Sequence, residues 1–172
     1  MPEKKTIERA RQDKREGKAP STQAGEFVRE TIEHIREGKH GARSTKQAIA
    51  IGLSKARRAG VKVPPPKKGQ ASARTRRSAE LASRAGSSGH EHKTNPRRSR
   101  AVTKALQREG HGAASSEALS RQAKRQAHKR SPTERSQTAR KAAKTRLAHQ
   151  THAERVAIAR KAARTRMAKH GG

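Results

Sequence analysis

The sequence of 172 residues contains no cysteine, tryptophan or tyrosine, and Phe27 is its single aromatic residue. Without cysteine the chain forms no disulfide, no cysteine-ligated zinc site and no thiol nucleophile. The lack of aromatic residues also removes the flat side chains on which single-stranded nucleic acids stack their bases. Thiol chemistry is therefore excluded, and recognition of single strands by stacking is disfavoured.

Large apolar residues are also scarce. Ile, Leu, Val, Met and Phe together account for 19 of the 172 residues, about 11%. A chain needs such side chains to offset the entropy lost when its backbone becomes ordered. Few apolar residues combined with a high net charge are typical of disordered segments and of segments that fold on binding.

The sequence has no long hydrophobic run. The first thirty residues contain no apolar stretch of the kind found in signal peptides, so we expect none. No segment approaches the roughly 20 apolar residues of a membrane span. We therefore expect a cytoplasmic protein.

Acidic residues are few, whereas basic residues are abundant. Against 14 Asp and Glu stand 44 Lys and Arg, which gives a formal net charge of +30. Nucleic acid is the expected partner, because clustered cations release counterions from a polyphosphate. Membrane surfaces are a less favoured partner, since amphipathic helices with large apolar faces are missing.

A change of composition marks a predicted domain boundary at "VPPPKKG", residues 63–69. Residues 1–63 carry a net charge of +8 and 11 of the 19 large apolar residues, whereas residues 64–172 carry +22. Three consecutive prolines cannot continue a helix and favour an extended spacer. We predict a small domain over residues 1–63 and a polybasic tail over residues 64–172.

Three helices are predicted in the first domain, over residues 3–16, 22–37 and 44–60. Ser44 and Gln47 have the spacing of a capping box at the start of the third helix. Gly38 and Gly60 are placed to end the second and third helices. A short loop between these two helices favours an antiparallel hairpin. The small apolar content makes a hairpin marginal by itself, so a second copy of the chain is a further candidate partner.

The tail contains a sequence repeat of two copies, each predicted to form a helix. "ARKAAKTRLAH" at 139–149 and "ARKAARTRMAK" at 159–169 agree at eight of eleven positions. Each copy has its own start signal, Ser131 with Glu134 and Thr151 with Glu154. Further helices are predicted at 95–110, where Gly110 would end the helix, and at 115–130, which resembles a degraded third copy.

The repeat units predict helices over 131–149 and 151–169 that have a narrow stripe of small residues and are otherwise mostly cationic. Phosphates would neutralise the repulsion between these cations, and repetition would multiply the phosphate contacts. Together with the end of the helix at 44–60, they give the predicted nucleic-acid-binding residues, which are Arg57, Arg58, Arg135, Arg140, Lys141, Lys144, Arg146, Arg155, Arg160, Lys161, Arg164 and Arg166.

The predicted fold class is all-α, with a small helical hairpin domain followed by a largely disordered basic tail that contains short helices. The predicted function is non-catalytic, largely sequence-independent binding of double-stranded DNA, as in nucleoid-associated or histone-like proteins. Two alternatives stay open. One is RNA binding in ribosome assembly or as an RNA chaperone, and the other is a protein-interaction hairpin that the tail tethers to nucleic acid.

Other chemistry finds little support in the sequence. His90, Glu91 and His92 lie in a Gly/Ser-rich segment, and His149 and His152 are an isolated pair without a further ligand cluster, so no metal site is predicted. No paired carboxylates, phosphate-binding glycine loop or serine with a base beside it is found. We predict neither enzymatic activity nor a cofactor or small-molecule substrate.

Residues 1–68 resemble a bacterial family of small basic proteins that carry a domain of unknown function. The resemblance lies in "RSTKQAIAIGLS", which fits the pattern R-[ST]-x-K-Q-A-[IV]-A-I-[AG]-L-S followed by a basic or proline-rich tail. Some members are labelled DNA-binding or plasmid-stabilisation proteins, so the resemblance implies a DNA-related role. The tail is similar in composition to histone H1-like bacterial tails. The residues that carry the family resemblance are Arg43, Lys46, Gln47, Ala48, Ile49, Ile51, Leu53 and Ser54.

Overall fold

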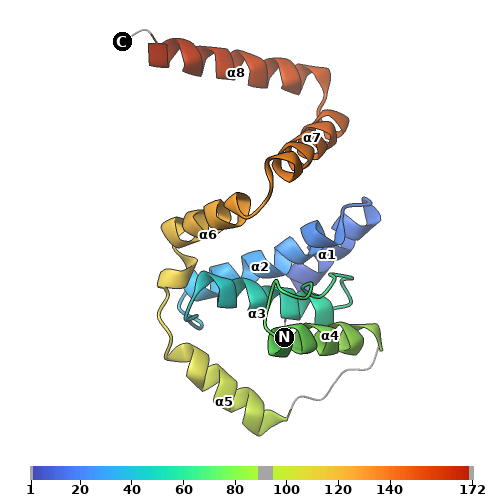
Figure 1. Ribbon diagram of the computed structural model, residues 1–172, viewed down its shortest axis with the longest axis vertical. Helices are drawn as coiled ribbons and strands as arrows, with labels where there is room; N and C mark the ends of the chain where they lie inside the picture. Colours follow the sequence, from blue (N-terminus) through green and yellow to red (C-terminus); the bar gives the residue numbers. More distant parts are fainter. Residues whose placement is uncertain (1, 89–94, 171–172) are drawn as a thin grey trace. The chain divides into compact units, whose positions relative to one another are not determined.

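The computed structural model describes residues 2–88 and 95–170, apart from the side chains of residues 149, 169 and 170. Over these residues the chain forms eight α-helices, one short 3-10 helix and no strand (Figure 1). The all-helical fold class is therefore confirmed for the part of the chain that the structure describes. The helices are α1 (Lys4–Arg15), α2 (Pro20–Arg36), α3 (Thr45–Arg58), α4 (Ala73–Ser87), α5 (Pro96–Gln107), η1 (Gly112–Ala114), α6 (Ser116–His128), α7 (Pro132–His149) and α8 (His152–His170).

The chain divides into two compact units, Met1–Ala123 and Lys124–Gly172. The boundary predicted at residues 63–64 lies inside the first unit. Two segments beyond the proline run cause this difference, because α4 packs on α3 and residues 109–119 return to the α2–α3 hairpin. The structure describes helices through most of residues 95–170, and a disordered tail is not seen there.

Glycines end each of the first three helices. Gly17, Gly38 and Gly60 have φ angles of 71°, 75° and 85°, in the left-handed region that only glycine adopts without strain. In each case the N–H of the glycine and the N–H of the next residue donate to carbonyls of the last helical turn. The helix ends predicted at Gly38 and Gly60 are confirmed.

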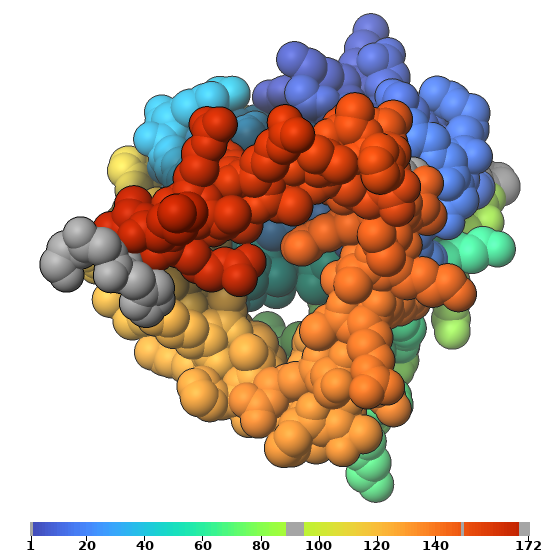
Figure 2. All heavy atoms as spheres, turned by 90° about the horizontal axis from the view of Figure 1, so that it is seen from above, coloured from blue at the N-terminus to red at the C-terminus, as the bar shows by residue number. Residues whose placement is uncertain are grey.

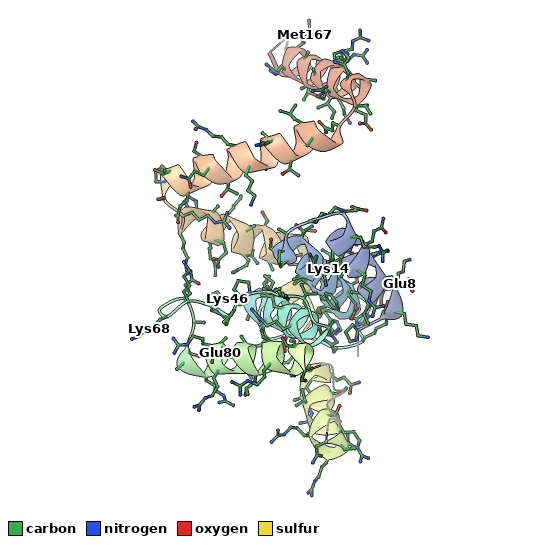
Figure 3. All side chains as sticks on the ribbon, turned by 90° about the vertical axis from the view of Figure 1, so that its right-hand side faces the viewer. Glu8, Lys14, Lys46, Lys68, Glu80 and Met167 are labelled. Carbon is green, nitrogen blue, oxygen red and sulfur yellow. The ribbon has the colours of Figure 1, made fainter. Side chains whose placement is uncertain are left out.

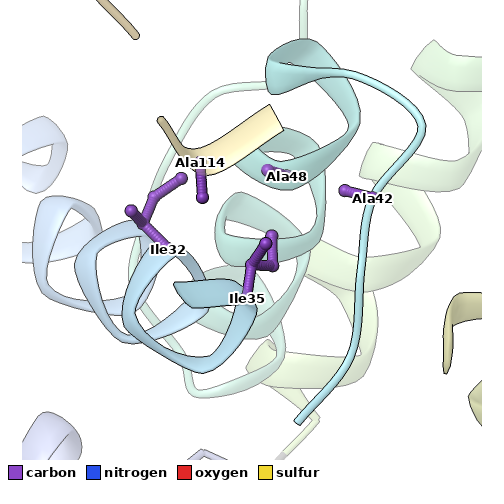
Figure 4. Close-up of a cluster of buried hydrophobic side chains, with 5 residues drawn as sticks. All are labelled: Ile32, Ile35, Ala42, Ala48 and Ala114. Atoms are coloured by element: carbon purple, nitrogen blue, oxygen red, sulfur yellow. The ribbon is translucent and has the colours of Figure 1, made fainter. Parts of the chain in front are cut away.

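Helices α2 and α3 form the predicted antiparallel hairpin. Ile35 packs with Ala48 at one end of the pair, and Phe27 packs with Ala56 at the other. The C-terminal end of α2 thus lies beside the N-terminal end of α3, as in an antiparallel pair. Figure 4 shows the cluster around Ile35. Phe27 and Ile35, 1% and 0% exposed, are two of the largest fully buried side chains of the described structure.

A glycine allows the two helices to approach closely. A Cβ atom added at Gly52 of α3 would lie 2.6 Å from the Cα of Val28 on α2. No real side chain fits at that distance, so the backbone of one helix contacts the other directly at this point. The close approach explains why alanines suffice on the α3 side of the core.

Helix α4 has no counterpart among the sequence predictions, although its start follows a familiar rule. The hydroxyl of Ser72 accepts a hydrogen bond from the N–H of Thr75 at 3.2 Å, as an N-cap residue does. The helix buries only Ala79 and Ala82, while Leu81 stays 57% exposed. A buried face made of alanines gives a weak apolar periodicity, which is why the pattern did not reveal it.

Residues 109–119 complete the core of the hairpin, and we call them the return segment. Ala114 is 0% exposed and lies in the same cluster as Ile35. The hydroxyl of Thr45 donates to the carbonyl of Ala113 at 2.8 Å, and the guanidinium of Arg36 donates to that of Ala114 at 2.9 Å. A segment of the predicted tail is therefore an integral part of the first unit.

Helix α5 begins as predicted and ends differently. The side chain of Asn95 accepts hydrogen bonds from the N–H groups of Arg97 and Arg98, and Pro96 opens the helix. The helix ends at Gln107, and Gly110 is not among the glycines with positive φ. The predicted helix end at Gly110 is therefore wrong. The carbonyl of Gly110 instead accepts a hydrogen bond from the loop between α2 and α3.

Candidate nucleic-acid interface

Helices α7 and α8 begin with the two capping boxes that the repeat predicts. In α7, the hydroxyl of Ser131 accepts from the N–H of Glu134, whose carboxylate accepts from the N–H of Ser131 at 2.9 Å. Thr151 and Glu154 make the same pair of bonds in α8. The backbone N–H and the hydroxyl of Thr151 both donate to the carboxylate of Glu154, and these two bonds lower the pKa of Glu154 below its usual value. Each repeat therefore starts its helix independently.

The second unit is overwhelmingly basic. Residues 124–172 contain 15 Lys and Arg against two acidic residues, a net charge of +13. Those two acidic residues are Glu134 and Glu154, and both engage the first turn of their own helix. Two carboxylates cannot neutralise 15 cations, so most of the lysines and arginines of this unit have no carboxylate of the same unit to pair with.

Ten of the twelve predicted binding residues lie on α7 and α8, and all ten are exposed. Figure 2 shows the side chains of these helices, in orange and red, as separate protrusions. Figure 3 shows them projecting from the helices on all sides. The ten exposed cations are Arg135, Arg140, Lys141, Lys144, Arg146, Arg155, Arg160, Lys161, Arg164 and Arg166.

The stripe of small residues on each repeat helix is largely exposed, and Val156 is its one half-buried member among the described residues. Leu147 at the end of the α7 stripe is 56% exposed, and Met167 at the same place in α8 is 75% exposed. Ile158, on another face of α8, is 53% exposed. The large apolar side chains Leu147, Ile158 and Met167 of the two helices therefore remain exposed.

The remaining two predicted binding residues belong to the first unit and have different surroundings. Arg58 is exposed at the end of α3. Arg57 is 6% exposed, and its guanidinium donates to the carbonyls of Val63 and Pro64 at 3.2 and 3.0 Å. Burial also lowers the pKa of Arg57. This side chain holds the proline run against α3, so we exclude Arg57 from the candidate interface.

A buried ion pair lies inside the first unit, where it connects helices to one another. Glu30 of α2 is 3% exposed, and Lys55 of α3 donates to its carboxylate at 2.7 Å. The other carboxylate oxygen accepts from the N–H of Glu3 at 3.1 Å, before α1. Burial raises the pKa of Glu30, but the hydrogen bonds from Lys55, Thr6 and Glu3 outweigh it and leave this pKa lowered. The pair joins α2, α3 and the start of α1.

The described residues contain neither a metal site nor a membrane-spanning helix. No group of three or more His, Asp or Glu side chains there is arranged to hold a metal ion. His90, Glu91 and His92 lie outside the described residues, as does the side chain of His149. None of the described helices is long and apolar enough to cross a membrane.

The first three helices coincide with a known sequence family. Residues 3–68 match a family of unknown function, DUF6496. The match spans α1 to α3 and the proline run, and it ends before α4. The comparisons found no matching curated protein and no matching solved structure. The return segment and the repeat helices α7 and α8 therefore lie outside the matched region, and the family's description assigns no activity.

Proposed function

We propose that this protein binds double-stranded DNA without catalysis and largely without sequence preference, in the manner of a nucleoid-associated or histone-like protein of the cytoplasm. The observation that supports this proposal is the state of the cations on α7 and α8. Ten of them are exposed, and the two acidic residues of their unit engage helix starts. Such cations gain most from a polyphosphate, because neutralising each phosphate releases condensed counterions.

Duplex is favoured over single strands because the chain offers no stacking platform. Proteins that hold single strands usually stack the bases on aromatic side chains. Phe27, the single aromatic residue, is 1% exposed and packs between α2, α3 and α1. The contacts of the exposed lysines and arginines would go to the phosphate backbone, which carries no sequence information directly.

Binding should also stabilise the repeat helices. Like charges three or four positions apart on a helix repel one another, and isolated helices of this length are marginal in water. Phosphates remove that repulsion, while alanine supplies high intrinsic helix propensity. We propose that α7 and α8 become more helical, or more rigidly so, when the duplex is bound.

Titration of the full chain against two nucleic acids tests the proposal. A random-sequence DNA duplex and a structured RNA of equal length are titrated at stepped salt concentrations, with circular dichroism recorded in parallel. We expect tight duplex binding whose affinity falls by about 0.9 log units per log unit of salt for each contacted phosphate. Helicity should rise on binding.

Two results would overturn this proposal. A clear preference for the structured RNA would assign the chain to RNA binding, in ribosome assembly or as a chaperone. Absence of binding to either nucleic acid at moderate salt would remove polyphosphates as partners altogether, and an anionic protein or surface would replace them.

A further inference from the structure

Five cations of each repeat helix fall on two opposite faces. An α-helix turns by about 100° per residue, so Arg140, Lys141 and Lys144 of α7 lie within an arc of about 100°. Arg135 and Arg146 lie within about 20° of each other, on the far side of the helix. We call the first set the triple face and the second the arginine-pair face. In α8 they are formed by Arg160, Lys161 and Arg164, and by Arg155 and Arg166.

Uncharged strips separate the two faces. One is the stripe of small residues, with Ala139 and Ala143 in α7. The other carries threonines whose hydroxyls are already used: Thr145 donates to the carbonyl of Lys141 at 3.0 Å, and Thr165 donates to that of Lys161 at 3.0 Å. In α7 neither strip contains a lysine or arginine, so the two faces are distinct surfaces there. In α8 the sequence adds Lys169, which by helical register falls beside the arginine-pair face. On α8, the triple face lines a shallow concavity together with Ala157.

Both copies of the repeat preserve both faces. All five cationic positions carry a cation in α7 and again in α8, and the arginine pair is arginine in both. Between the cationic positions the two copies differ only where Ser136, Gln137 and Thr138 are replaced by Val156, Ala157 and Ile158. Both arginines of the pair are kept although the three residues after the first one change.

We infer that the two faces bind two different duplexes, so that α7 and α8 bridge DNA segments. This inference rests on the proposed function and extends it to a second DNA partner. A helix with its side chains is about 10–12 Å across, so a helix that rests on the phosphates of one duplex through one face directs the other face away. The outward arginines stay exposed, which suits a second polyphosphate.

Two variants of the full chain that remove equal charge separate the faces. The triple-face variant carries Arg140→Gln, Lys144→Gln, Arg160→Gln and Arg164→Gln. The arginine-pair variant carries Arg135→Gln, Arg146→Gln, Arg155→Gln and Arg166→Gln. Glutamine keeps a helix propensity close to that of arginine and lysine, and circular dichroism checks that helicity is unchanged. Each protein is measured for binding to one duplex and for capture of a labelled duplex on an immobilised duplex.

The arginine-pair variant should bind a single duplex within about threefold of the parent, since it retains the triple face. Its capture of the second duplex should fall at least about tenfold, because the outward contacts are lost. The triple-face variant should bind a single duplex more weakly, with a salt slope shallower by about 3 to 4.

Two outcomes overturn the inference while leaving the proposed function intact. If both variants lose single-duplex affinity and salt slope equally, the two faces grip one duplex, as for a helix seated in a groove. If the arginine-pair variant captures the second duplex as well as the parent, bridging does not depend on this face. Absence of single-duplex binding by the parent chain, in contrast, would contradict the proposed function itself.

Discussion

Glu30 illustrates at the scale of a single residue how this highly charged chain tolerates a buried charge. Its carboxylate is 3% exposed and is held by the ammonium of Lys55 at 2.7 Å and by the N–H of Glu3 at 3.1 Å. Removing one partner of a buried pair leaves the other charge without compensation, which costs far more than the pair contributes.

Replacing Lys55 by methionine should therefore lower the free energy of unfolding by about 3 kcal/mol. Lys46→Met on the same helix is the matched control, because Lys46 is exposed, and it should change stability by less than about 0.5 kcal/mol. Urea unfolding followed by circular dichroism measures both. Equal effects of the two substitutions would show that the ion pair does not hold the hairpin.

The lowered pKa of Glu30 predicts a dependence of stability on pH. Near the ordinary glutamate value of 4.5 the unfolded chain binds more protons at this site than the folded chain. Stability from Glu30 is therefore complete above that pH and is lost as the pH falls through the lowered pKa of the folded state. Unfolding measured from pH 7 downwards should show this loss in the parent, and a flatter profile in Glu30→Gln. Parallel profiles would contradict the assignment.

At the scale of elements, close backbone contacts supplement the few large buried side chains that hold the helices of the first unit together. Gly52 lets α3 touch α2, Gly86 lets α4 approach the end of α3, and Gly41 admits the return segment. A Cβ added at Gly86 would lie 1.9 Å from the carbonyl oxygen of Arg57. A chain with few large apolar residues thus gains its packing from close approach.

Gly52→Ala should destabilise the α2–α3 hairpin by about 2 kcal/mol, because the new methyl group has no room beside Val28. Gly25→Ala on α2 is the opposite control, since a Cβ there meets nothing within 4 Å. It should stabilise the chain by about 0.5 to 1 kcal/mol through helix propensity. Thermal unfolding of the two variants measures the loss of stability expected for Gly52→Ala and the gain expected for Gly25→Ala. If Gly52→Ala left the stability unchanged, the close contact would be refuted.

Gly41→Ala should detach the return segment from the hairpin. A Cβ at Gly41 would lie 1.8 Å from the carbonyl oxygen of Glu109, whereas one at Gly112 meets nothing within 4 Å. The N–H of Ala42 donates to the carbonyl of Gly110 at 3.1 Å and reports the contact. We expect faster hydrogen exchange at Ala42 in Gly41→Ala and little change in Gly112→Ala. Unchanged protection in Gly41→Ala would show that the segment is not held there.

The same elements show why some helices could be predicted from the sequence and others could not. Capping is local, so Ser131 with Glu134 located α7 without knowledge of the fold. For α3 the N-cap Ser44 is confirmed, but the amide oxygen of Gln47 accepts from the N–H of Arg43, one residue earlier than in a capping box. Helix α4 and the return segment depend on contacts with distant residues, which no local pattern contains.

The residues of the candidate site also fall into those that the sequence could predict and one that it could not. The charge of α7 and α8 follows from composition and periodicity, and the exposure of their ten cations agrees with the prediction. Arg57 and Arg58 are consecutive arginines in the last turn of α3, yet Arg57 is buried and donates to the carbonyls of Val63 and Pro64. Only the path of the chain after α3 decides which of the two arginines faces solvent.

At the scale of the whole molecule, the two units differ in packing and in charge. The first unit contains the family match at residues 3–68 and the packed helices, and it carries most of the acidic residues. The second unit, Lys124–Gly172, carries a net charge of +13 in the repeat helices. The central claim is that nucleic-acid affinity resides in the repeats rather than in total charge.

The salt dependence of duplex binding tests this claim most directly when equal charge is removed from each unit. One variant of the full chain carries the four substitutions of the triple face. The other neutralises four exposed cations of α1, namely Lys4→Gln, Lys5→Gln, Arg11→Gln and Lys14→Gln. We predict that the salt slope becomes shallower by about 3 to 4 in the first variant and by less than about 1 in the second. Equal reductions in both would contradict the account, because total charge would then set the affinity.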